Sequence, residues 1–304
     1  MDAHASEIDT ASIERAVAFA RDAGTAQLVI VQGARVLADE AFSPEPVDVY
    51  AVQKGLVSVM VGMAEDRGLL GLSDPVSAHL GAGWTQLPPS AEQRLTIRAV
   101  LDMTTGVDDE LQLLGTVGVT WRYDNMSYNY LKTVLETVTD LSLAELSEAW
   151  LFGPLGMGST RWVERSVLRP DGRAITGLLS TARDIARFGT MVRRGGDGLA
   201  PQSYVGSLGR PGSEENPAWG LCWWNNDQPH HRLPRAESEV RIGPVVPGAP
   251  ADTITARGAA ENRLYVVPSL DLVVARTFAP VRGERPTPFD AGFWEALVGD
   301  EHSR

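Results

Sequence analysis

Apolar residues gather in short, strand-like runs near both ends of the chain and in longer, helix-like stretches between them. Residues 10–23 repeat apolar positions at helical spacing, and two strands separated by a glycine turn follow at 26–31 and 35–42. Near the C-terminus the pattern predicts three more strands and a last helix. These strands cover 253–257, 263–267 and 272–277, and the helix covers 286–298.

The middle of the chain reads differently. From Gly68 to about Trp162 the pattern is mostly helical, and residues 181–193 predict a further helix. A Gly- and Pro-rich loop over 195–217 precedes a tryptophan-rich strand at 218–224, which contains the only cysteine, Cys222. Residues 226–252 form a polar, Pro-rich excursion.

The arrangement predicts an α+β fold in which one antiparallel sheet is built from both chain ends. Helices flank this sheet, and a mostly helical domain is inserted into it. We expect residues 1–60 and 175–304 to form the sheet domain and residues 61–174 the helical domain, with an active site between them.

One apolar stretch, residues 49–64, predicts a buried helix of about four turns. Its first turn carries Lys54, one of two lysines in the chain; Lys132 is the other. Two interpretations of Lys54 compete. Its stem could cover apolar surface while the ammonium reaches water. Alternatively, burial could lower its pKa and make it a base.

Charge and composition limit the partners. The net charge of −12 disfavours nucleic acid and anionic membranes as partners, so we expect a small-molecule substrate. The first residues lack a basic region followed by an apolar core, and one cysteine forbids an internal disulfide, which together favour the cytoplasm. The oligomeric state stays open.

Histidine is scarce, and none of the five histidines is well placed for a Ser-His-Asp triad. A Gly-x-Ser-x-Gly elbow does not occur in the sequence, and zinc ligands are few. We therefore expect no metal and no organic cofactor, and a hydrolase would need a base other than histidine. Cys222 reads as a buried strand residue, not a nucleophile.

Ordered segments along the chain give a more specific indication. A Gln53-Lys54 pair opens the apolar helix, Tyr123-Asp124-Asn125 resembles a Tyr-x-Asn motif, and Gly258 lies in the slot of a Lys-Thr-Gly-like strand. Three longer stretches fit between these motifs in matching order: residues 68–76, 95–106 and 152–157. The chain thus resembles the serine β-lactamase and penicillin-binding-protein superfamily, in the branch of class C β-lactamases, DD-peptidases, esterases and 6-aminohexanoate-oligomer hydrolases.

The resemblance implies an amide or ester hydrolase or acyltransferase. In this design a serine attacks a carbonyl, Lys54 removes its proton, and Tyr123 passes the proton to the leaving group. Asn125 would hold a substrate amide. Backbone N–H groups of Ala51 and Ala259, beside Gly258, would stabilise the oxyanion. Arg257 either contacts an anionic group or points away from the pocket.

The nucleophile position departs from the family pattern, because Ala51 lies three residues before Lys54. No Ser-x-x-Lys occurs anywhere, so this chain cannot form an acyl-serine. Acylation should fall by about 10³–10⁶ while binding persists. Three explanations remain: a serine hydrolase whose serine was replaced to trap a ligand, a natural binding or regulatory pseudoenzyme, or a non-covalent acid–base enzyme using Lys54 and Tyr123.

Structural roles for the partner residues also remain possible. Tyr123 could be a core tyrosine with a satisfied hydroxyl, and Asn125 could be a turn residue beside the next helix.

Overall fold

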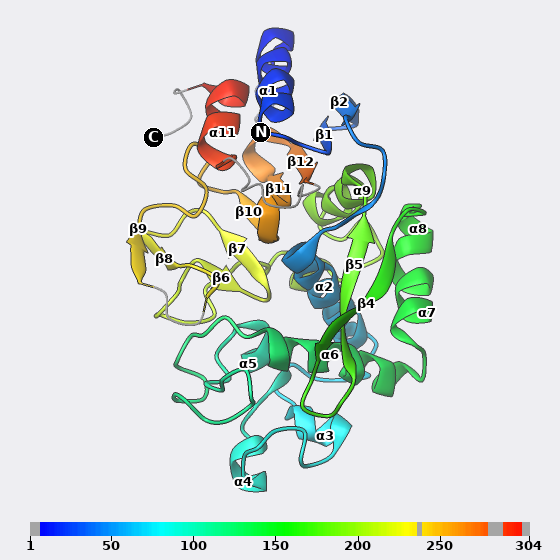
Figure 1. Ribbon diagram of the computed structural model, residues 1–304, viewed down its shortest axis with the longest axis vertical. Helices are drawn as coiled ribbons and strands as arrows, with labels where there is room; N and C mark the ends of the chain where they lie inside the picture. Colours follow the sequence, from blue (N-terminus) through cyan, green and yellow to red (C-terminus); the bar gives the residue numbers. More distant parts are fainter. Residues whose placement is uncertain (1–6, 236–238, 279–287, 300–304) are drawn as a thin grey trace.

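The computed structural model describes residues 7–235, 239–278 and 288–299. Their main feature is a seven-stranded antiparallel sheet in the order β2-β1-β12-β11-β10-β7-β6 (Figure 1). The strands are β1 (Gln27–Gln32), β2 (Arg35–Ala41), β6 (Trp219–Gly220), β7 (Trp223–Asn225), β10 (Ile254–Arg257), β11 (Arg263–Val267) and β12 (Leu272–Thr277). The N-terminal strand β1 pairs with the C-terminal strand β12 from Gln27↔Thr277 to Gln32↔Leu272, which confirms the sheet predicted from both chain ends.

Helices cover both faces of this sheet. On one face, α9 (Ala182–Arg193) packs so closely that a Cβ on Gly189 would lie 2.6 Å from Leu264. The next residue on β11, Tyr265, stacks edge-on against Trp294 of α11 (Asp290–Val298), with ring centroids 5.3 Å apart. Successive strand residues point to opposite faces, so α9 and α11 lie on opposite sides.

The N-terminal helix α1 (Thr10–Asp22) lies beside α11, and the rings of Phe19 and Phe289 are 5.8 Å apart (Figure 1). The predicted C-terminal helix is confirmed over Asp290–Val298. Its first two expected residues, 286 and 287, lie outside the described part of the chain.

Helix α2 (Gln53–Asp66) lies at the centre of the molecule, and its residues from Gln53 to Ala64 are buried. A 3₁₀ turn, η1 (Tyr50–Val52), leads into it. Two glycines allow close packing: a Cβ on Gly55 would lie 3.0 Å from Trp223, and one on Gly62 would lie 2.4 Å from the ring of Tyr204. Close approach of this kind is the usual use of glycine inside a helix.

Helices fill most of the segment after α2. They are α3 (Val76–Leu80), α4 (Pro89–Glu92), α5 (Ile97–Leu101), α6 (Asn125–Thr139), α7 (Leu143–Ser147), a π-helical turn η2 (Glu148–Phe152) and α8 (Gly153–Leu155); α10 (Gln202–Val205) follows α9. Thr96 caps α5 as its sequence predicts, because its side chain accepts a hydrogen bond from the Ala99 N–H.

A second, three-stranded sheet lies in segments where the sequence pattern predicted no strand. It contains β3 (Val47–Asp48), β5 (Ala174–Ser180) and β4 (Arg161–Leu168), in that order. Strand β4 is mostly exposed and interleaves charged residues with apolar ones, so it lacks the apolar run that identifies a buried strand. The sheet joins strands from both sides of the expected domain boundary, and the two-domain division stays a prediction.

The prediction of a single strand at 218–224 is wrong. The segment is a tight hairpin, β6–β7, whose turn residues Leu221 and Cys222 have φ of 50° and 62°. Hydrogen bonds hold this glycine-free turn: the Leu221 N–H donates to Asp102 and the Cys222 N–H to Leu101 O, both at 2.9 Å. Contacts with the end of α5 therefore override the local preference.

The expected polar excursion contains a further hairpin, β8 (His230–Arg232) with β9 (Val240–Ile242). Within the described ranges, we find no helix whose length and apolar content would suffice to cross a bilayer.

Candidate active site

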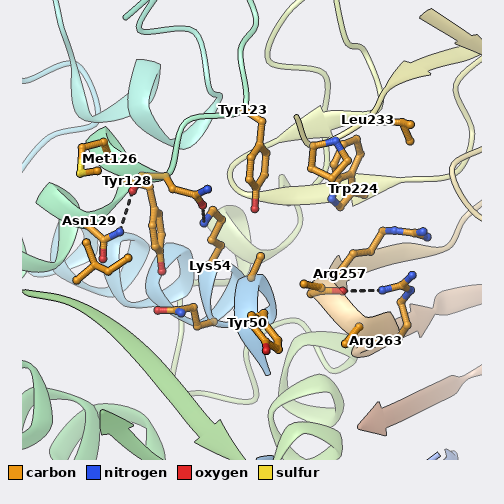
Figure 2. A pocket seen from close by; sticks show the side chains of 18 of the residues that line it. Tyr50, Lys54, Tyr123, Met126, Tyr128, Asn129, Trp224, Leu233, Arg257 and Arg263 are labelled. Atoms are coloured by element: carbon orange, nitrogen blue, oxygen red, sulfur yellow. Dashed lines mark hydrogen bonds between the residues drawn. The ribbon is translucent and has the colours of Figure 1, made fainter. Parts of the chain in front are cut away.

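A pocket of about 800 Å³ opens beside the N-terminal end of α2 (Figure 2). Its walls come from η1 and α2, the start of α6, the β4–β5 hairpin, the end of β10 and the segment around β8. All of the site residues predicted from sequence line it: Ala51, Lys54, Tyr123, Asn125, Arg257, Gly258 and Ala259. The fold thus brings together segments separated by more than 200 residues.

Lys54 is the central charged group of the pocket. Its side chain is buried, and Nζ donates to Oδ1 of Asn125 at 2.7 Å. Nζ also lies 4.0 Å from the ring centroid of Tyr128 and 5.1 Å from that of Tyr123 (Figure 2). Burial lowers the pKa of Lys54 to about 8, with a contribution from Arg165, while Cys222 and Asp124 oppose the shift. The interpretation of Lys54 as a snorkelling surface lysine is therefore wrong.

The turn before Lys54 is held in an unusual backbone conformation. Tyr50, which precedes Ala51, has φ of 49°, a left-handed value that costs energy for a residue with a side chain. Its N–H donates to Asp48 Oδ1 at 2.8 Å, and Arg165 binds both carboxylate oxygens of Asp48 at 2.7 Å. These contacts fix the position of Ala51, one turn ahead of Lys54.

The N-terminus of α6 positions the next two residues. Asp124 caps this helix by accepting from the N–H groups of Met126 and Ser127 at 2.7 and 3.1 Å. Tyr123 and Asn125 flank the cap, and Asn125 forms the first residue of α6. Burial raises the pKa of Tyr123 far above its usual value, so its hydroxyl stays protonated at neutral pH. Tyr123 can therefore donate a proton there, but not accept one as a phenolate.

The opposite wall is the end of β10. A Cβ on Gly258 would lie 2.2 Å from the backbone oxygen of Val49, so β10 touches the turn that leads to Ala51. Ala259 then opens a 3₁₀ turn, η3 (Ala259–Glu261). The N–H groups of Ala51 and Ala259 both lie in the first turn of a short helix, where backbone donors have no partner within the helix.

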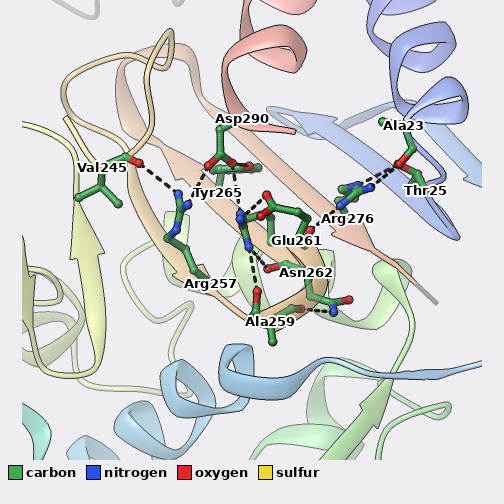
Figure 3. Close-up of polar contacts among 12 residues, drawn as sticks. Ala23, Thr25, Val245, Arg257, Ala259, Glu261, Asn262, Tyr265, Arg276 and Asp290 are labelled. Carbon is green, nitrogen blue, oxygen red and sulfur yellow. Dashed lines mark hydrogen bonds and ion pairs between the residues drawn. The ribbon is translucent and has the colours of Figure 1, made fainter. Parts of the chain in front are cut away.

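A network of buried arginines supports this turn (Figure 3). Ala260 and Glu261 have φ of 56° and 59°, a strained conformation for residues other than glycine. Arg263 donates to the oxygens of Gly258 and Asn262 at 2.9 and 3.0 Å, and Arg276 donates to Glu261 O at 2.7 Å. The network thus holds Ala259 against the pocket.

Arg257 lines the pocket, but its guanidinium forms an ion pair with Asp290 of α11. The Nη2 and Oδ2 atoms of this pair lie 2.8 Å apart, so the charge of Arg257 is already balanced. The carboxylate of Asp290 also binds Arg263 at 3.2 Å and accepts from the hydroxyl of Tyr265. Burial alone would raise the pKa of Asp290, but the guanidiniums of Arg257 and Arg263 outweigh it and hold this pKa well below its usual range. The guanidinium of Arg257 is thus directed toward α11 (Figure 3).

Several lining residues escaped the sequence analysis. They are Tyr128, Asn129 and Thr176, which surround the second lysine, Lys132, and Arg165, which lies beside the turn at Tyr50. Gln53 was noted only as the neighbour of Lys54, and its contact with Lys132 was not foreseen. The sequence held one clue to this cluster: Lys132 is one of only two lysines in the chain. In the structure it is as deeply buried as Lys54. Arg165 lies on β4, a strand that the pattern did not reveal.

Comparisons with known proteins bear on the fold and the family of this chain. An uncharacterized protein of Alkalihalophilus pseudofirmus is 26% identical over 260 residues, which span 76% of this chain and 72% of that protein. The solved structure of EstCE1, described as a hydrolase with promiscuous acyltransferase activity, has a TM-score of 0.69 at 15% identity, covering 95% of this chain and 99% of its own. A D-stereospecific amidohydrolase from Streptomyces has a TM-score of 0.65 at 16% identity, and the match covers 95% of this chain and 98% of that protein.

At 15% and 16% identity, the similarity to these two structures establishes the fold alone. The family assignment comes from the family model described as Beta-lactamase, which matches residues 11–285. Since that match spans most of the sequence and the sheet topology fits it, this chain belongs to the beta-lactamase family.

Proposed function

We propose that the pocket binds an amide or ester and is built to transfer the acyl group of that substrate through a serine at position 51. The observation that carries the proposal is Lys54: a buried lysine with a pKa of about 8, one helical turn after position 51 and hydrogen-bonded to Asn125. Lysine with a lowered pKa is suited to act as a general base near neutral pH.

The reaction that this geometry supports has two proton transfers. With serine at position 51, the hydroxyl oxygen attacks the substrate carbonyl while its proton moves to the neutral amine of Lys54. The carbonyl oxygen becomes an oxyanion that accepts from the N–H groups of Ala259 and of residue 51. When the carbon–leaving-group bond breaks, the Tyr123 hydroxyl gives a proton to the leaving group and regains one from Lys54. Water or another acceptor then takes the acyl group.

Ala51 removes the oxygen that this reaction needs and leaves both N–H donors in place. The present sequence would therefore bind substrate without being acylated, as a serine hydrolase does when its serine has been replaced. A serine codon at position 51 of the encoding gene would identify this case, and an alanine codon would favour a binding pseudoenzyme.

The experiment is to install Ala51→Ser and treat both proteins with a fluorophosphonate. We expect one adduct per chain, on residue 51, in the substituted protein and none on this residue in the parent. A folded Ala51→Ser protein that never labels would contradict the acyl-transfer proposal.

A non-covalent acid–base enzyme is the second candidate, favoured by the protonated Tyr123 beside the weakly basic Lys54. It predicts turnover by the Ala51 protein that disappears in Lys54→Ala. Absence of turnover on amides and esters that bind the pocket would count against it.

A further inference from the structure

Lys132 is the second buried lysine of the molecule, and the reaction proposed above leaves it without a role. Its Nζ lies within hydrogen-bonding distance of four oxygens. They are Gln53 Oε1 at 2.6 Å, Asn129 Oδ1 at 3.0 Å, and Thr176 O and Oγ1 at 2.9 and 2.8 Å. An ammonium has three N–H donors for these oxygens and no lone pair. A neutral amine would lose one donor and direct a lone pair at an acceptor.

Lys54 and Lys132 share one aromatic neighbour, Tyr128. The Lys54 Nζ lies 4.0 Å from the centroid of this ring and the Lys132 Nζ lies 5.2 Å from it. The two nitrogens are therefore no further apart than the sum of these distances, 9.2 Å. At an effective dielectric constant of about 20, a unit charge at that distance changes the protonation midpoint of its neighbour by about one pH unit.

The two lysines differ in how well their charge is solvated by the protein. In the described part of the chain, Lys54 has one hydrogen-bonding oxygen, Oδ1 of Asn125, whereas Lys132 has four. Burial, followed by the charges of Lys54, Arg165 and Arg169, lowers the pKa of Lys132 well below its usual value. Its four acceptor oxygens favour the charged form and oppose this shift, whereas Lys54 has only one such oxygen to do so. The difference in hydrogen bonding favours Lys54 as the member of the pair that releases a proton first.

We propose that Lys132 is a positioning residue: a fixed cation that weakens proton binding at Lys54 across the ring of Tyr128. Repulsion between like charges within a buried site is a known way to make a lysine reactive. The charged groups around the pair are Asp48, Asp124, Arg165 and Arg169. Cys222 also lies near Lys54, but burial raises the pKa of its thiol to about 12, so it stays neutral. These groups stay the same when Lys132 is replaced, so its own contribution can be measured.

The inference rests on the proposed role of Lys54 as a base, but its test does not require acylation. Because the chain contains two lysines, protein labelled with ¹³C at lysine Cε gives two side-chain NMR signals. Lys54→Arg and Lys132→Arg each remove one signal and assign the other. A failed Ala51→Ser reaction would therefore leave this measurement of the Lys132 effect intact.

In the parent protein we expect the Lys54 signal to titrate near pH 8 and the Lys132 signal to keep its ammonium shift to higher pH. In Lys132→Met, which keeps the stem and removes the charge, the midpoint of Lys54 should rise by about one pH unit. Thr176→Val removes a hydrogen bond from the same cluster without changing its charge, and should leave that midpoint unmoved.

Two results would overturn the proposal. One is an unchanged Lys54 midpoint in folded Lys132→Met. The other is release of the Lys132 proton at or below the midpoint of Lys54 in the parent protein, which decides the question even if the Met variant fails to fold.

Discussion

Lys54 places a cation in the buried part of a mostly apolar helix, and this placement costs folding free energy. Its pKa is lower in the folded protein than in the unfolded chain, so the unfolded chain binds more protons between about pH 8 and pH 10.4. Stability therefore rises with pH across that window, and the full cost is present below it.

Lys54→Met should remove this cost. We expect the free energy of unfolding to increase by about 2 kcal/mol at pH 7, less than the shift alone implies, because contacts with Asn125 and Tyr128 are lost. Urea unfolding at pH 7 and pH 10 measures the effect, and the gain should shrink at pH 10. An equal gain at both pH values, or a loss at pH 7, would show that burial of the charge is not what lowers stability.

Site residues could be predicted where their partners in the site lie only a few positions away in the sequence. Ala51 and Lys54 share a helical turn, and Tyr123 and Asn125 flank one cap, so short motifs specify their relation. Asp290 could not be assigned to Arg257 in this way, since 33 residues separate them and the pairing arises only when α11 packs on the sheet. The shared Tyr128 ring likewise depends on how α6 meets α2.

The contact between β10 and η1 depends on the absence of a side chain at Gly258. Gly258→Ala adds a Cβ that would lie 2.2 Å from Val49 O, and backbone cannot yield as a flexible side chain can. We expect a loss of about 2 kcal/mol in unfolding free energy and, combined with Ala51→Ser, weaker fluorophosphonate labelling. Gly158→Ala is the matched control, because a Cβ there has no atom within 4 Å. Equal stability of the two variants would refute the close contact.

Asp290 holds α11 to the strand ends through Arg257 and Arg263. Asp290→Asn removes the carboxylate that Arg257 binds and leaves Arg263 paired with Glu261 alone. We expect a loss of about 3 kcal/mol in unfolding free energy at pH 7, measured by chemical unfolding. The lowered pKa of Asp290 adds a pH signature. Its stabilisation is present above the unfolded pKa of about 3.9 and is lost as pH falls below it.

The difference between parent and Asp290→Asn should accordingly narrow between pH 5 and pH 3. A constant difference over that range would assign the loss to packing and not to charge.

At the scale of elements, the apolar runs predicted β1, β10, β11 and β12 closely, because these strands are largely buried and their composition shows it. Strand β2 is mostly exposed, and the glycine turn after β1 revealed it instead. Strand β4 is largely exposed, and the β6–β7 turn is imposed by α5, so neither carries a local signal. The elements that escaped prediction are those whose conformation depends on distant partners.

In the whole molecule, the pocket forms where the inserted helices meet the sheet. Helix α2 contributes Lys54, α6 contributes Asn125, and the segment that follows β10 contributes Gly258 and Ala259. The sequence predicted this junction because its motifs occur in the order of the family. The carboxylates that pair with the arginines of the pocket, Asp48 with Arg165 and Asp290 with Arg257 and Arg263, emerged only from the folded arrangement.

The central claim is that everything except the attacking oxygen is in place around residue 51. The most direct test is the rate at which Ala51→Ser gains one acyl group from an activated ester, followed by intact mass between pH 6 and pH 9.5. We predict a single adduct on residue 51, a rate that rises with a midpoint near pH 8, and a loss of about 10³-fold or more when Lys54 is also changed to Met. No adduct, or a rate indifferent to both pH and Lys54, would contradict the account.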